Sequence, residues 1–130
     1  MGGERDLARL LASMRPEPRD GAHVFTTADS VPEGAHPVVT VWEPEGVTLV
    51  LARDDADRLG LSYEYVAAMV TLRVRSALDA VGLTAAVAGE LAEHGISCNV
   101  VAAYFHDHLF VPHERGEDVV ALLEALASRG

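Results

Sequence analysis

The chain contains no lysine and only one cysteine, and each of these features excludes some classes of function. All ten cationic residues are arginine, against twenty acidic residues, which gives a formal net charge of -10. A surface of that sign repels phosphate, so the composition argues against binding to nucleic acid and against docking on anionic membranes. One cysteine, Cys98, cannot form an internal disulfide, which is typical of reducing compartments. We therefore predict a cytoplasmic protein with neither nucleic acid nor membrane as a partner.

Long apolar runs are absent as well. No segment approaches the roughly 18 to 20 apolar residues that span a bilayer. The first residues, 1–6, turn acidic at once, so we expect no signal peptide. Apolar residues nevertheless make up 49% of the 130 residues, which is enough for one compact domain or two very small ones.

Apolar spacing and β-branched runs predict the elements. Stripes at i, i+3, i+4 and i+7 predict a first helix from Leu7 to Met14, ended by Pro16 and Pro18, and a last helix over 119–126. A third helix is expected from Leu83 to Gly95, and a short one over 54–60 with Asp54 as N-cap. Strands are expected over 23–27, 38–42, 47–51, 69–75, 97–105 and 109–111.

The strands at 38–42 and 47–51 should pair as a hairpin, because Pro44 and Gly46 suit a type I turn between them. In the strand over 69–75, Val70 and Leu72 should face a core and Thr71 the opposite side. The order of elements predicts an α+β fold of ferredoxin-like, split βαβ type, with antiparallel sheets covered by helices on one face. The other face must be polar, paired or covered by a partner.

Several runs resemble the ACT domain family. Residues 79–84, the following helix, and the Gly95-Ile96 return strand match the family's strand, glycine-ended loop, helix and return strand. A subgroup of uncharacterised bacterial ACT-like proteins with two ACT-like halves is similar over four runs: 10–16, 43–50, 80–87 and 99–112. The resemblance implies an incomplete N-terminal half over 1–62 and a C-terminal half over 63–130, packed as one compact unit.

The family implies a regulatory or sensor module that binds a small molecule, most typically an amino acid, without catalysis or cofactor, and that pairs side by side as a homodimer. Its ligand loop falls here on Asp79, Ala80, Val81, Gly82 and Leu83. The return strand adds two further residues to the expected ligand site: Asn99 and Val100. A helix N-terminus suits a carboxylate, Gly82 permits close approach, and Asp79 would receive an ammonium group.

Other functions remain open. A ligand-free interaction module would use a sheet face or edge. His106 and His108 flank Asp107 in a pattern that could hold a metal, although a metal site needs three or four converging ligands. A hydrolase would pair Ser76 or Cys98 with a histidine, but no nucleophile elbow surrounds either, so we expect no enzyme.

Three further groups have two interpretations each. Arg73 and Arg75 either clamp a carboxylate or lie on a solvated face. Tyr63 and Tyr65 precede a strand, where tyrosines line a pocket or an interface. Trp42 stands at the end of the predicted hairpin, in the core or at an interface.

Overall fold

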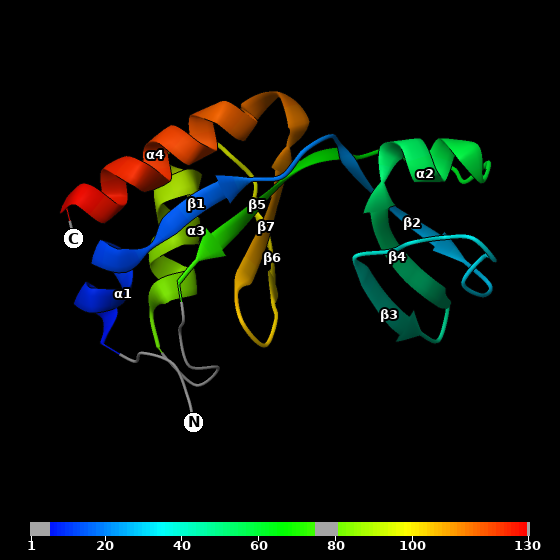
Figure 1. Cartoon of the computed structure of the whole chain (residues 1–130), viewed down its shortest axis with the longest axis horizontal. Helices are drawn as coiled ribbons and strands as arrows, with labels where there is room; N and C mark the ends of the chain where they lie inside the picture. Colours follow the sequence, from blue (N-terminus) through cyan, green and yellow to red (C-terminus); the bar gives the residue numbers. More distant parts are fainter. Residues whose placement is uncertain (1–5, 75–80, 130) are drawn as a thin grey trace. The chain divides into compact units, whose positions relative to one another are not determined.

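The computed structural model describes residues 6–74 and 81–129, which form two compact units (Figure 1). One unit is Asp20–Ala67. The other combines Met1–Arg19 with Ala68–Gly130. Each is a sheet covered by helices, so the predicted α+β class is confirmed. The predicted division into halves 1–62 and 63–130 stays a prediction.

The unit Asp20–Ala67 is built on the hairpin that the sequence predicts. Strands β3 (Val39–Glu43) and β4 (Gly46–Ala52) pair antiparallel, with Glu43 opposite Gly46. On the other side of β4 lies β2 (His23–Ala28), which also pairs with the first residues of β5 (Val66–Arg73). The strand β3 is therefore the edge of this unit's sheet.

The helix α2 (Arg53–Arg58) covers one face of this sheet. It packs its buried Ala56 against Val24, Leu49 and Leu51. The prediction that Asp54 caps this helix is wrong, because the N-cap position is Ala52 and Asp54 lies in the first turn. An aspartate in the first turn still favours the helix through the macrodipole.

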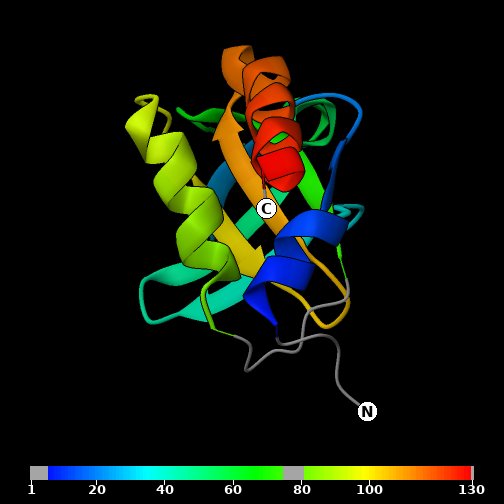
Figure 2. The same ribbon diagram turned by 90° about the vertical axis from the view of Figure 1, so that its left-hand side faces the viewer.

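The other unit has its strands in the order β1-β5-β7-β6. Strand β1 is Arg15–Pro18, β6 is Asn99–Ala102 and β7 is Asp107–Pro112. Figure 2 looks onto its helices, α1 (Leu7–Ser13), α3 (Leu83–Glu93) and α4 (Gly116–Arg129), the last preceded by a 3-10 turn, His113–Arg115. The succession of elements β5-α3-β6-β7-α4 is the split βαβ arrangement that the sequence predicts.

A single apolar core joins these three helices to the sheet. Its buried members come mainly from β5, β7 and the three helices, and the helical ones are those that the apolar stripes predict: Leu10, Met14, Leu83, Val87, Leu91, Val119 and Leu123. Gly89, on α3, has open space where a Cβ would stand, so an alanine there would fit.

Strand β1 is the element that the sequence does not reveal. Pro16 and Pro18 end the helix, as predicted, but they also belong to a strand, opposite Leu72 and Val70. Proline lacks the N–H that a central strand donates to its ladder, so it is confined to edges. Among the described residues β1 pairs with β5 alone, which is the edge position that tolerates two prolines.

Candidate functional site

The N-terminus of α3 is the first candidate site. Its N-cap is Gly82, at φ +106°, and no side chain among the described residues caps the helix. The N–H groups of the first turn have no partner within a helix. Every other described α-helix carries an acidic residue at its start: Asp6 caps α1, while α2 and α4 have acidic side chains in their first turns. The start of α3 therefore keeps its partial positive charge.

The predicted ligand loop is only partly visible. Asp79 and Ala80 lie outside the described residues. Val81 is 83% exposed, whereas Leu83 is buried in the core. A Cβ on Gly82 would stand 3.2 Å from Cδ2 of Leu7, so α1 packs closely against this loop.

Asn99 and Val100 lie away from that loop. Both begin β6, directly after the C-terminal end of α3, and β6 then runs back toward the end of the unit where α3 begins (Figures 1 and 2). Val100 packs against the core and Asn99 is exposed. The structure thus groups Val81, Gly82 and Leu83 and sets Asn99 and Val100 apart from them.

The turn between β6 and β7 shares the end of the unit with the start of α3. His106 Nδ1 lies 3.4 Å from the carbonyl oxygen of Val74, at the end of β5. Next to it, Tyr104 and Phe105 form an edge-to-face pair with ring centroids 5.0 Å apart, and both rings are exposed. Sequence periodicity assigns these residues to a longer strand, which ends instead at Ala102.

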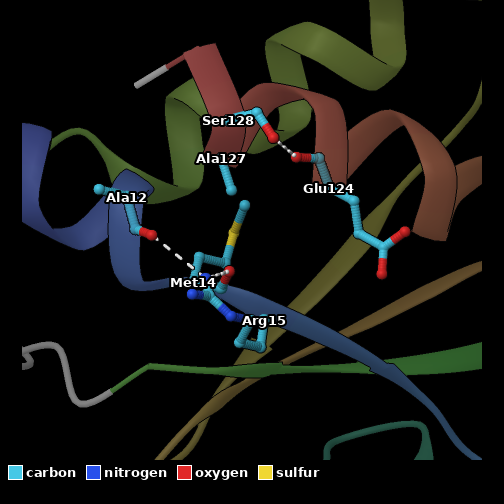
Figure 3. Close-up of a pocket in the computed structure, with 6 residues that line it drawn as sticks. All are labelled: Ala12, Met14, Arg15, Glu124, Ala127 and Ser128. Atoms are coloured by element: carbon cyan, nitrogen blue, oxygen red, sulfur yellow. Dashed lines mark hydrogen bonds between the residues drawn. The ribbon is translucent and has the colours of Figure 1, made fainter.

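A second candidate is a hollow of about 360 Å³ between α1, the start of β1, and α4. Figure 3 shows its six lining residues: Ala12, Met14 and Arg15 on one side, Glu124, Ala127 and Ser128 on the other. None of these six residues is predicted from the sequence as a site residue, because the hollow depends on how two helices far apart in the chain pack.

A third candidate is a buried polar cluster on the sheet face turned away from the helices. Thr71 lies on the face opposite Val70 and Leu72, as predicted, and it is 1% exposed. Its hydroxyl accepts a 3.2 Å hydrogen bond from Nη1 of Arg19 and lies 2.9 Å from Nδ1 of His108. The Thr71 hydroxyl also has one proton, which it can donate to Nδ1 of a neutral His108.

Burial, followed by the charges of Arg19 and His106, lowers the pKa of His108, and only Asp107 opposes this. Burial raises the pKa of Asp107 against the two histidines. Protonation of Nδ1 would also remove the lone pair with which His108 accepts a hydrogen bond from Thr71. The surroundings of His108, which include Arg19 and Asp107, therefore favour its neutral form.

We predict that this cluster makes the fold sensitive to acid. The ordinary histidine pKa is 6.5, and the folded value of His108 lies below it. The unfolded chain therefore takes up the proton first, so the stabilisation is complete above pH 6.5 and is lost as pH falls from there through the folded pKa. Urea unfolding of the wild type and of His108→Gln, followed across pH 7 to 5, measures the difference.

The stability of His108→Gln should fall less steeply than that of the wild type below pH 6.5. Asp107, whose raised pKa acts in the opposite direction at lower pH, is present in both chains. Parallel curves would contradict the prediction.

The next two candidates are a metal site at His106 and His108 and a nucleophile at Cys98. Among residues 6–74 and 81–129, no three histidine, cysteine, aspartate or glutamate side chains are grouped as metal ligands, which leaves His106 and His108 as a pair. Burial raises the pKa of the Cys98 thiol to about 11, so it is protonated at neutral pH and a poor nucleophile.

In the unit Asp20–Ala67, an open hollow of about 700 Å³ is lined by both predicted tyrosines, Tyr63 and Tyr65, and by threonines of β2 and β4. Tyr63 donates to Asp57 at 2.7 Å, and the ring of Tyr65 lies 6.0 Å from that of Phe25. Trp42, 69% exposed on the edge strand β3, is not a core residue.

Comparison with known proteins decides the family. Models described as ACT domain match residues 2–68 and again residues 64–125. The chain belongs to the ACT domain family. ACT domains are regulatory domains that generally bind small molecules such as amino acids. No curated protein matches the chain.

Solved structures agree with this assignment. A Vibrio cholerae protein of unknown function, described as a possible transport protein, is 44% identical, with a TM-score of 0.84 over 93% of this chain and 95% of that one. A structure of aspartokinase α and β subunits is 12% identical, with a TM-score of 0.63 over 88% and 97%. Aspartate kinase of Clostridium acetobutylicum, an allosteric enzyme, is 9% identical, with a TM-score of 0.64 over 90% and 34%.

The two kinase structures share the ferredoxin-like ACT fold with this chain, which confirms the predicted fold class. In the described part of the chain, no helix is long and apolar enough to cross a membrane.

Proposed function

We propose that this ACT protein is a regulatory module that binds an amino acid without catalysing a reaction. The ligand site is the loop 79–83. The observation that supports it best is the start of α3, which has no acidic residue in its first turn and no capping side chain from the residues that the structure describes. Two consecutive ACT matches support the regulatory class.

The chemistry of the site follows from the helix terminus. Free N–H groups and the positive end of the macrodipole suit a carboxylate. Val81, which is exposed beside them, offers an apolar contact to a ligand side chain. Asp79 is proposed to receive the ammonium group, as the family resemblance implies. We also propose that the module acts as a homodimer in the cytoplasm.

The experiment is a titration of the isotope-labelled full chain with each of the twenty amino acids, followed by amide NMR. One amino acid should shift the amide signals of residues 81–85 in a saturable way, and should raise the melting temperature by mass action. The same spectra test Asn99 and Val100. If no amino acid moves residues 81–85 at millimolar concentration, the proposed function is wrong.

A substitution at Gly82 tests whether the loop itself binds. Gly82→Ala places a side chain at φ +106° and 3.2 Å from Leu7, so it should weaken binding and lower the free energy of unfolding by about 1 to 2 kcal/mol. Leu7→Ala in the same chain removes the contact but leaves the backbone strain. Gly89→Ala on the same helix, where a Cβ has open space, is the matched control and should bind normally.

Exposed apolar residues on β3 favour a second function, a ligand-free interaction module. Val38, Val41 and Trp42 are all about half exposed or more on or beside the edge strand. Edge strands have free backbone groups that can pair with another chain. In that case no amino acid shifts the amide signals in the titration, and Val41→Lys alters the oligomeric state or the binding of a partner.

A further inference from the structure

The hollow between α1 and α4 has the chemistry of a small-molecule site, starting with its arginine. Nη1 of Arg15 donates to the carbonyl oxygens of Ala12 at 3.1 Å and of Met14 at 2.8 Å. These bonds cap the C-terminal end of α1 and use both hydrogens of Nη1. The guanidinium is thereby fixed before any ligand arrives.

The rest of that guanidinium remains available. Within the described residues, Nε and Nη2 of Arg15 make no hydrogen bond, and Arg15 has no carboxylate partner. Nε and Nη2 form the side edge that binds a carboxylate through two parallel hydrogen bonds.

The opposite wall, on α4, has the complementary charge. Glu124 is exposed, and its carboxylate makes no hydrogen bond or ion pair with the residues that the structure describes. Ser128 donates to the main-chain oxygen of Glu124 at 3.1 Å, so its own oxygen can still accept. This wall suits an ammonium group or another donor and repels a second carboxylate.

Between the two charged residues the lining is apolar. Met14 belongs to the core, and Ala12 and Ala127 add only methyl groups. Figure 3 shows the Met14 side chain directed toward Ala127, with Arg15 and Glu124 on separate sides. A volume of about 360 Å³ is at the small end of the range for ligand pockets.

We propose that this hollow binds a small zwitterion with an apolar side chain: Arg15 takes its carboxylate, Glu124 its ammonium group, and the methyl-lined floor its side chain. The site is built by α1 and α4 and does not include the loop 79–83. The chain would then have two ligand sites on this unit, so the proposal stands or falls independently of the proposed function.

The test uses three probes that differ by one group each: leucine, 3-methylbutylamine, which lacks the carboxylate, and 4-methylpentanoate, which lacks the amine. Amide NMR of the labelled full chain reports the site, through residues 12–15 and 124–128. Leucine should shift these signals with a dissociation constant of about a millimolar or below. Both truncated probes should bind about tenfold more weakly or worse.

Variants separate the two charged contacts. Arg15→Lys keeps the charge and can still cap α1, but it loses the two-pronged edge, so leucine should bind about tenfold more weakly. Glu124→Gln should weaken leucine and leave 4-methylpentanoate unchanged or tighter. Glu93→Gln, at an exposed glutamate on α3, is the matched control and should change neither. Ala127→Leu fills the hollow and should abolish binding while keeping the fold.

The outcomes distinguish the two sites. Shifts confined to residues 81–85 would overturn the hollow as a ligand site and support the proposed function. Shifts at 12–15 and 124–128 alone would support the hollow and would mean that leucine is not the ligand of the loop 79–83. If 4-methylpentanoate binds as well as leucine, or if Arg15→Lys binds normally, the zwitterion assignment is wrong.

Discussion

Replacing Phe110 by alanine is expected to lower the free energy of unfolding by about 3 to 5 kcal/mol, the range for a large aromatic core residue. Phe110 lies in the middle of β7 and is fully buried. Its neighbours Leu109 and Val111 belong to the helix-covered core, so Phe110 points to the opposite face of the sheet. That face also holds the buried Thr71, and it is therefore not a simple solvated surface.

The matched control is Phe105→Ala, five residues earlier on the same hairpin. Phe105 is 57% exposed and contacts Tyr104 edge to face, so its loss should cost about 1 kcal/mol or less. Urea unfolding of the two variants, followed by circular dichroism, measures both values. Similar losses at the two positions would mean that the face of β7 opposite the helices contributes little to stability.

The sequence alone does not distinguish these two phenylalanines, because both stand in apolar runs near a turn. Their difference depends on which face of β7 each occupies and on what lies above that face, and neither is local information. By contrast, the apolar stripes of α1, α3 and α4 predict buried residues correctly, since helical spacing puts their side chains on one face whatever they pack against.

The residues of the candidate sites also fall into some that the sequence predicts and some that it does not. The glycine at the start of α3 is predictable through the resemblance to the ACT family, which places a glycine-ended loop before this helix. The side chains around the hollow of Arg15 and Glu124 are not predictable, because more than a hundred residues separate them and only the packing of α1 on α4 brings them together. Strand β1 was hidden by its two prolines, which local rules assign to a loop.

Gly46→Ala is the second large effect that we expect, with a loss of about 2 to 4 kcal/mol. The turn pattern around Pro44 explains a glycine at this position only as a turn residue. In the structure its φ of +151° is a conformation that L residues rarely adopt. A Cβ there would stand 2.9 Å from Oγ1 of Thr27 and 3.0 Å from the carbonyl oxygen of Ala28.

Two comparisons separate the causes of that loss. Gly21→Ala, at φ +75° with open space around its Cβ, has backbone strain without a clash and should cost about 1 to 2 kcal/mol. Thr27→Ala added to Gly46→Ala should restore only part of the stability. The threonine oxygen is removed, but the carbonyl of Ala28 is held in β2 by its pairing with β4. Full recovery in the double variant would mean that the Thr27 side chain alone makes the site intolerant. An unchanged loss would instead place the cost in the backbone of Gly46 and in the close approach of β2.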